Sequence, residues 1–388
     1  MRADWIVELD RATTAVVAAV GRVQYMRQVT PLNLAAARAR FLAAYPAVGA
    51  SDPVFEYAEP PADPTDALRE AADLLPAGPP WRALLEDQIE IARQAYQALC
   101  SRSPAETTAY ALRQYGTPDE TVLSAALRDL AVVQSPADTE HGGATWPAEQ
   151  ARAVLAAVLD RAGLATWSVQ VREHMVARMS VLSSQRRVSV RADAVFGTSE
   201  LRRLIVHEVG THVFRSANAE RQPLGLLAVG PPGYLSTEEG LAAWHERAAG
   251  LLSPEVRRRY ALRYLACHAG LEHGFRAVVD RLIEHTDVAE AFEITARVKR
   301  GLIDTSAPGG FIKDQVYFGG LMETGNCLNQ HPDAYDLLMA SKWPVRHIPL
   351  LRELRADRLL LPPAYRVEQA VELAHELTAE RTATPHEC

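Results

Sequence analysis

The stretch "LRRLIVHEVGTHVFR", residues 201–215, carries two histidines in an otherwise apolar segment. His207 and His212 are separated by five positions, and Glu208 directly follows the first of them. A common zinc-binding helix has its two histidines only four positions apart, again with a glutamate after the first. Whether His207 and His212 can share a metal ion therefore depends on the shape of the helix between them.

The five-residue spacing does not suit a regular α-helix. Five residues turn such a helix by about 500°, which leaves the two side chains roughly 140° apart. Their nitrogens could not both approach one ion to the ~2.0–2.1 Å of a Zn–N bond. A π-type widening returns positions i and i+5 to one face, and such bulges cluster at functional sites. Because Gly210 lies in the interval and tolerates distortion best, we expect the widening near Gly210.

The alternative is that His207 and His212 are ordinary solvated or core histidines. Glu208 argues against that alternative, because the flanking letters "LIV" and "VF" indicate a buried helix. An unpaired carboxylate in such a place costs several kcal/mol. A positive ion beside Glu208 would remove this cost, so the residues favour a metal site.

A zinc site also needs a third protein ligand and an open position for water. The segment "YLSTEEGLAAWHE" (234–246) offers Glu239 near the start of an apolar helix. Ser236 and Glu239 also fit a capping box, so that Glu238 and Glu239 could divide the two roles between them. Glu246 lies two turns further and could hold a ligating histidine. An exposed Glu246 that forms a surface ion pair fits the sequence equally well.

The composition describes a globular protein of 388 residues, with 48% apolar and 23% charged residues. A net charge of -7 argues against nonspecific binding to nucleic acid. No apolar run approaches the roughly 20 residues that span a membrane, and the amino terminus lacks a secretory apolar segment. The four cysteines are scattered without a CxxC pair, which predicts neither disulfides nor a cysteine-based zinc site. We expect a cytoplasmic protein without nucleic-acid or membrane partners.

The first third of the chain is predicted to consist of successive helices, because its apolar residues recur at helical spacing. We expect these helices at residues 4–23, 32–44, 81–100, 104–115 and 118–131. The polar, glycine-containing stretch 134–147 is the best candidate for a boundary. The predicted domains are an N-terminal helical region, 1–140, and a catalytic domain, 141–388.

The second domain is predicted to open with a helix at 147–163 and two strands, 167–173 and 186–195. The histidine helix, 199–217, follows the strands, and a helix with Glu239 comes next. This order is typical of zincin-like metallopeptidases. We therefore expect a mainly α fold (α+β), with a small β-sheet beside the histidine helix.

The motifs taken together resemble a known family. "HEVGTH" followed by "EEGLA" is similar to the QEGLA-motif family, which includes the microtubule-associated tyrosine carboxypeptidases and whose metal motif is HExxxH. The resemblance extends over most of the chain. It includes the segments "TPLNLAAARARFL", "DPVFEY", "RMSVLSSQRRVSVRADAVF", "SANAERQPL", "PPGYLSTEEGLA" and "GGFIKDQVYFGG". Glu238 stands where many members have the Gln of QEGLA. The arginine- and alanine-rich composition points to a bacterial member.

The resemblance implies one Zn²⁺ per chain, with His207, His212 and Glu239 as ligands and Glu208 as catalytic base. The chemistry of the residues agrees, because zinc lowers the pKa of bound water toward ~7 and a carboxylate can take its proton. Glu246 is a candidate partner of a ligating histidine.

The substrate would be a peptide or small amide with a free carboxylate, for which Lys or Arg is the natural donor. Lys313, in the glycine-flanked "GGFIKDQVY", and Arg191, on the strand before the histidine helix, are candidates. Tyr317 could donate a hydrogen bond to the developing oxyanion. For each of these residues, ordinary packing or a surface position is the alternative.

The function expected from the sequence is that of a zinc-dependent carboxypeptidase-like metallohydrolase. The alternative is a zinc-bearing regulatory protein that binds a peptide without cleaving it. An intact Glu208 argues against that alternative, because a binding protein needs ligands but no base. A purely structural zinc site would need a fourth protein ligand, and the sequence offers none.

Overall fold

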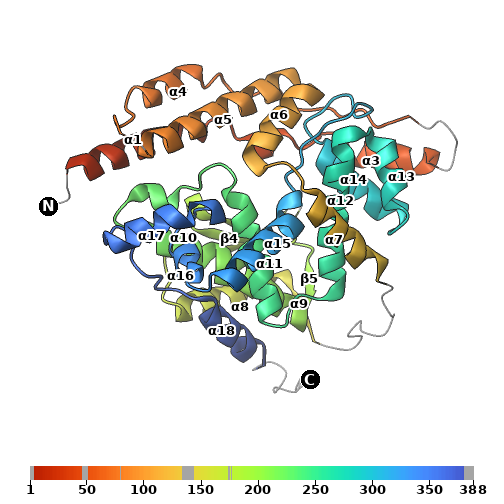
Figure 1. Cartoon of the computed structure of the whole chain (residues 1–388). Helices are drawn as coiled ribbons and strands as arrows, with labels where there is room; N and C mark the ends of the chain where they lie inside the picture. Colours follow the sequence, from red (N-terminus) through yellow and green to blue (C-terminus); the bar gives the residue numbers. More distant parts are fainter. Residues whose placement is uncertain are drawn as a thin grey trace. The chain divides into compact units, whose positions relative to one another are not determined.

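The computed structural model describes residues 4–45, 51–78, 80–132, 144–173, 175 and 177–379 (Figure 1). The chain forms two compact units, each assembled from separate segments. Unit 1 comprises Met1–Val132, Leu224–Ser236 and Glu255–Met322, and unit 2 comprises Val133–Pro223, Thr237–Pro254 and Glu323–Cys388. The boundary expected near residue 140 lies within 133–143, outside the described residues, and the two-domain division stays a prediction.

Unit 1 is built from helices in its described part. Its N-terminal segment contains α1 (Asp4–Val20), α2 (Tyr25–Gln28), α3 (Leu34–Ala44), α4 (Thr65–Ala72), α5 (Trp81–Ser101), α6 (Pro104–Tyr115) and α7 (Glu120–Ala131). Its later segments add the 3-10 turn η4 (Gly225–Ala228), α12 (Pro254–Glu272), α13 (Phe275–Leu282), α14 (Val288–Lys299) and the start of α15 (Gln315–Gln330). The five N-terminal helices expected from the sequence are present. Helix α4, which lies between proline-rich stretches, was not expected.

Aromatic side chains form much of the core of unit 1. Phe275 and Phe292 lie with their ring centroids 5.0 Å apart, and Phe41 packs within 5.3 Å of both. Lys299, which is fully buried, donates from Nζ to the carbonyl oxygens of Gly309 (2.7 Å) and Ala307 (2.9 Å). The ammonium group therefore ties the loop before α15 to the end of α14.

Unit 2 contains the strands. A three-stranded sheet has the order β2-β4-β3, formed by β2 (Ser168–Arg172), β4 (Arg187–Arg191) and β3 (Met179–Leu182). Strand β2 is parallel to β4, with Val169 opposite Val188, whereas β3 is antiparallel to it. A second pair joins β1 (Thr145–Pro147) to β5 (Val195–Gly197). The strand expected at 186–195 is thus two strands, because the turn after Arg191 sends β5 to another partner.

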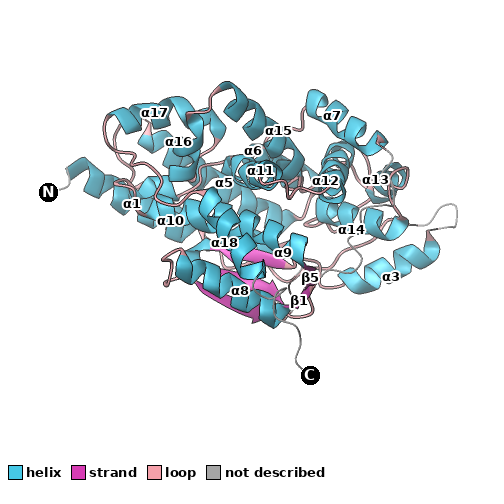
Figure 2. Cartoon of the chain, turned by 90° about the horizontal axis from the view of Figure 1, so that it is seen from below, coloured by secondary structure: helices cyan, strands magenta, loops and turns pink. Residues whose placement is uncertain are grey.

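The helices of unit 2 surround this sheet and the histidine-bearing segment. They are α8 (Ala148–Arg161), the 3-10 turn η2 (Ser183–Gln185), α9 (Thr198–Leu204), α10 (Phe214–Glu220), α11 (Tyr234–Ala248), α16 (Ala334–Ala340), η5 (Val345–His347), α17 (Ile348–Ala356) and α18 (Val367–Ala379). Figure 2 shows the strands in magenta alongside α8, α9 and α18. Helix α8 packs against β2 and β4. The expected mainly α (α+β) fold with a small sheet is confirmed.

Between α9 and α10 the chain is not α-helical. Residues Ile205–Val213 form a π-helix, η3, that contains both His207 and His212. The predicted widening is therefore confirmed. Segment η3 is buried along almost its whole length and contacts β3 and α18. Because other elements pack around η3, apolar residues on all of its faces are buried.

Gly210 allows η3 to approach α18 closely. A Cβ atom at Gly210 would lie 3.0 Å from Ala370 Cβ and 3.1 Å from Val367 Cγ2. Both contacts are tighter than ordinary van der Waals contact. The glycine thus has a packing reason as well as the conformational one that the sequence suggested.

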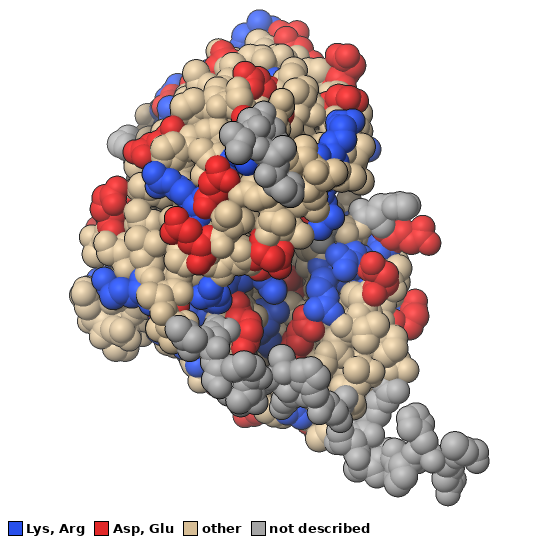
Figure 3. Space-filling view, turned by 90° about the vertical axis from the view of Figure 1, so that its right-hand side faces the viewer, with Lys and Arg blue, Asp and Glu red and all other residues tan. Residues whose placement is uncertain are grey.

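The described helices include none that is both long and apolar enough to cross a lipid bilayer. On the face shown in Figure 3, basic and acidic side chains are interspersed over the described residues. Such mixing is what 41 basic and 48 acidic residues lead one to expect. The cytoplasmic location stays a prediction.

Replacing Gly210 by Ala should lower the stability of the protein. Overpacking lowers the free energy of unfolding by ~1–3 kcal/mol, whereas Ala in place of Gly in a helix raises it by roughly 1 kcal/mol. We therefore expect the free energy of unfolding to fall by about 1 kcal/mol. The measurement is the midpoint of denaturant unfolding. In an Ala370→Gly background, which removes the 3.0 Å contact and leaves the 3.1 Å contact with Val367, the same substitution should destabilise less. Equal destabilisation in both backgrounds would show that the contact with Ala370 is not the cause.

Candidate metal centre

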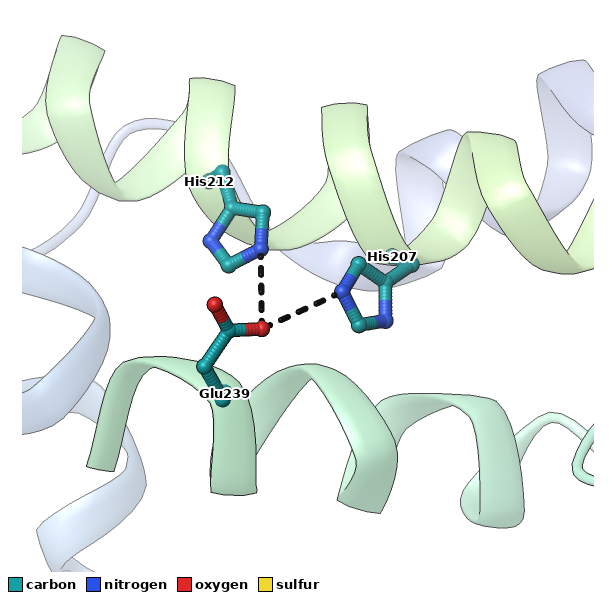
Figure 4. A group of neighbouring side chains, drawn as sticks. All are labelled: His207, His212 and Glu239. Atoms are coloured by element: carbon teal, nitrogen blue, oxygen red, sulfur yellow. Dashed lines mark ion pairs between the residues drawn. The ribbon is translucent and has the colours of Figure 1, made fainter. Parts of the chain in front are cut away.

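Three side chains of unit 2 converge on one point. His207 and His212 extend from η3, and Glu239 extends toward them from α11 (Figure 4). The Nε2 atom of His207 lies 3.4 Å from Glu239 Oε2, and the Nε2 atom of His212 lies 3.7 Å from the same oxygen. One potential ligand atom from each residue lies within 4.8 Å of the other two.

This spacing fits a single tetrahedral ion. Ligand atoms about 2.0–2.1 Å from zinc at tetrahedral angles lie about 3.4 Å from one another. Two imidazole nitrogens and a carboxylate oxygen are also ligand types that zinc accepts. Among the His, Cys, Asp and Glu residues that the structure describes, the set has three members, the number of protein ligands that catalytic zinc sites use.

His207 is oriented by a buried carboxylate. Its Nδ1 atom lies 2.8 Å from Oε1 of Glu246, which in turn accepts a 2.7 Å hydrogen bond from Arg203 Nη1. Because an ionised carboxylate can only accept, the proton belongs on Nδ1 and Nε2 is free to face a metal ion. Burial alone would raise the pKa of Glu246, but the bond to His207 and the charge of Arg203 lower it. Glu246 is fully buried, so the exposed position that the sequence also allowed is excluded.

His212 is oriented in the same way by Glu238. Its Nδ1 atom lies 2.9 Å from Glu238 Oε1, and Arg215 donates to the other oxygen of that carboxylate. Arg215 is fully buried and also donates to the carbonyl oxygens of Leu338 and Ser341, each at 2.8 Å. Burial alone would raise the pKa of Glu238, but Lys342 and Arg215 hold it well below its usual value. Each histidine is therefore held by a carboxylate that is itself paired with an arginine.

Negatively charged carboxylates surround His207. Burial disfavours the charged imidazolium, but hydrogen bonds to Glu239 and Glu246, together with the charge of Glu208, raise the pKa of His207 to about 10. Glu208 itself is buried and directly follows His207 in η3. The raised pKa of His207 shows that the surrounding carboxylates stabilise a positive charge at this position. A bound cation can take the place of the additional proton on His207.

The other predicted site residues are not members of this set. Tyr317, in α15 of unit 1, stacks on Tyr260 with ring centroids 5.3 Å apart. Lys313 precedes α15, and its Nζ lies 5.7 Å from the centre of the Tyr317 ring. Arg191 ends β4 in unit 2, where its Nε donates to Asp193 at 2.5 Å. The catalytic role of Tyr317 and the substrate-binding roles of Lys313 and Arg191 stay predictions.

The capping-box interpretation of α11 is wrong in the structure. The helix begins at Tyr234, so Ser236 lies inside it and is not the N-cap. Glu238 instead points to His212 and Arg215, a contact that the sequence interpretation missed. A signal was present: Arg215 follows "HVF" in a helix expected to be buried, and a buried guanidinium requires a carboxylate partner.

A comparison with protein-family models matches residues 39–382 to the family described as microtubule-associated tyrosine carboxypeptidase. The chain belongs to this family. The match includes η3 and α11, so His207, His212 and Glu239 of this tyrosine carboxypeptidase family member lie within the matched region.

Individual relatives match over a shorter stretch. The chain is similar to microtubule-associated tyrosine carboxypeptidase 1 of Mus musculus, with 37% identity over 124 residues, and of Homo sapiens, with 37% identity over 126 residues. The Rattus norvegicus protein of that name is 36% identical over 129 residues. Each match covers 31% of this chain and 26% of the relative. The matched part therefore spans about a quarter of these relatives' length.

Glu246→Gln and Glu238→Gln should each weaken metal binding by about 10–100-fold, because the carboxylates fix the tautomer and orientation of the histidines. The measurement is competition with a chromophoric chelator. Glu372→Gln, an exposed glutamate on α18, is the matched control and should leave the affinity unchanged. Unchanged affinity in both site variants would contradict the orienting role.

Proposed function

We propose that this chain is a zinc-dependent carboxypeptidase that hydrolyses a peptide or amide bond near the carboxy terminus of its substrate. The observation that carries the proposal is the convergence of His207 Nε2 and His212 Nε2 on Glu239 Oε2, while each Nδ1 is occupied by a buried carboxylate. Membership of the tyrosine carboxypeptidase family supports it.

The residues of the chain would divide the reaction as follows. A zinc ion supplies acidification of water and polarisation of a carbonyl group. Glu208, buried directly after His207 in η3, would accept the proton of the attacking water and pass it to the leaving amine. Glu246 and Glu238 would hold the two imidazoles in the orientation that directs Nε2 to the ion. Tyr317 would donate a hydrogen bond to the oxyanion that develops on the scissile carbonyl.

The substrate that we propose is a peptide or small amide with a free carboxylate, held by Lys313 or Arg191. Asp193 already accepts a hydrogen bond from Arg191, which offsets part of the arginine's charge and favours Lys313. We also propose that the protein acts in the cytoplasm. The described cysteines, Cys100, Cys267 and Cys327, are free thiols, as is usual in a reducing compartment.

The non-catalytic alternative gains no support from the residues. A regulatory zinc protein would need His207, His212 and Glu239 but no carboxylate to accept a proton. Glu208 is nevertheless buried, its charge acts on His207, and its side chain is absent from the group of candidate ligand atoms. Burying a carboxylate that binds no metal ion costs free energy. A catalytic role would explain why the chain has this carboxylate, so the position of Glu208 favours catalysis.

Glu208→Gln tests the proposed reaction. The variant should retain one zinc ion per chain, because Glu208 is not a ligand, and should lose about 10²–10⁴-fold in turnover, the usual contribution of a general base. Elemental analysis and mass spectrometry of a peptide library after incubation measure the two quantities. Glu372→Gln is again the control. Wild-type turnover in Glu208→Gln, or wild-type protein purified without chelators that contains no zinc, would overturn the proposal.

The proposed carboxylate recognition is tested with paired peptides that end in either a free carboxylate or a carboxamide. A hydrogen bond to a charged group contributes about 1.5–3 kcal/mol, so kcat/KM should fall roughly 10–100-fold for the amide. Lys313→Met and Arg191→Met identify the donor: the variant that removes the difference between the two peptides has lost the contact. Equal hydrolysis of both peptides by the wild type would exclude a carboxypeptidase.

A further inference from the structure

A buried threonine and a buried histidine form a contact beside the ligand set. Thr211 precedes His212 in η3, and its Oγ1 lies 2.7 Å from Nδ1 of His245 on α11. The same hydroxyl donates to the carbonyl oxygen of Val206 at 3.3 Å. Thr211 is fully buried and His245 is 1% exposed. Neither Thr211 nor His245 belongs to the group of candidate metal ligands. Neither residue has a role in the proposed hydrolysis.

The directions of these hydrogen bonds follow from the protons available. Both contacts are satisfied together when the Thr211 hydroxyl gives its one proton to Val206 and His245 donates from Nδ1 to Oγ1. Burial, reinforced by the positive charge of Arg215, lowers the pKa of His245 to about 3. The ring is therefore neutral. Its Nε2, which has no partner in the structure, is then a bare acceptor, and a buried acceptor without a partner is tolerated better than a donor.

The bond from Thr211 to Val206 is specific to the widened helix. Threonine hydroxyls in α-helices return to the carbonyl three or four residues earlier. Thr211 instead reaches Val206, five residues earlier, which is the spacing of π-helical hydrogen bonds. The side chain therefore spans the turn of η3 that separates His207 from His212.

Besides the contacts of Glu239, three side-chain contacts among the described residues connect η3 to α11. His207 meets Glu246 and His212 meets Glu238, and these two contacts orient imidazole rings. The third contact, between Thr211 and His245, holds the backbone between the rings. Because the π-helix is less favourable than an α-helix in isolation, it persists only where the surroundings hold it.

We propose that Thr211 and His245 are positioning residues, which hold the π-helical register of η3 and thereby keep the Nε2 atoms of His207 and His212 directed at one point. They act through the helix backbone and touch neither metal nor substrate. The effect on zinc affinity rests on the proposed function, whereas the effect on the helix does not.

The first test is Thr211→Val, which keeps the shape of the side chain and removes the hydroxyl. Zinc affinity should fall by at least roughly 10-fold, the effect of losing a residue that orients a ligand, and the absorption spectrum of the Co²⁺-substituted protein should shift. Thr211→Ser should restore both. Thr324→Val in unit 2 is the matched control, because Thr324 is fully buried with a hydroxyl that has no partner, and it should leave both unchanged.

A crystal structure of metal-free Thr211→Val separates this inference from the proposed function. We expect an α-helical register through residues 205–213, with the two imidazoles on different faces. A retained π-helix would overturn the inference whether or not the wild type binds zinc. Unchanged zinc affinity and Co²⁺ spectrum in Thr211→Val, with only a lower unfolding temperature, would also overturn it, because a packing role alone predicts that result.

A second pair of variants covers the case in which Thr211→Val does not fold. His245→Asn keeps an amide donor near the position of Nδ1, whereas His245→Leu removes it. Zinc affinity should stay within about threefold of wild type in His245→Asn and fall at least roughly 10-fold in His245→Leu. Equal losses in both would show that the hydrogen bond is not the cause.

Discussion

The π-helical widening of η3 is the constraint on which the site depends. Two imidazoles five residues apart meet one carboxylate oxygen of Glu239 only because the helix that carries them, Ile205–Val213, takes an extra residue into its turn. A conformation of this kind needs support from its neighbours. Strand β3 and helix α18 pack against η3, and the hydrogen bonds from α11 hold its polar residues.

The electrostatics of the site follow from burying this helix. Four carboxylates, those of Glu208, Glu238, Glu239 and Glu246, lie in the interior of unit 2. Arg203, Arg215 and Lys342 pair with two of them, so that Glu238 and Glu246 remain ionised. Hydrogen bonds to Glu239 and Glu246 and the charge of Glu208 raise the pKa of His207. A divalent ion would balance the charge and leave the histidines neutral.

Much of the fold and part of the site could be predicted from the sequence. The helical spacing of apolar residues in the N-terminal helices and the apolar–polar alternation around Val188 are local patterns. Local patterns can be recognised in the sequence alone. The strand expected at 186–195 was extended too far because the turn after Arg191 carries no strong sequence signal. Lys299 illustrates the same limit: its backbone acceptors come from the end of α12 and from the loop before α15, which meet only in the folded chain.

The sequence by itself determined which residues could be metal donors and that His207 and His212 require a widened helix, because side-chain chemistry and helical geometry need no tertiary information. The family resemblance named Glu239 as the ligand, but only the tertiary structure gave the physical reason why Glu238 and Glu239 differ. Adjacent residues on a helix point about 100° apart, so the rotation of α11 about its axis determines which carboxylate faces both Nε2 atoms. That rotation is fixed by packing against η3 and by the bonds to Arg203 and Arg215, which come from positions well separated in the chain.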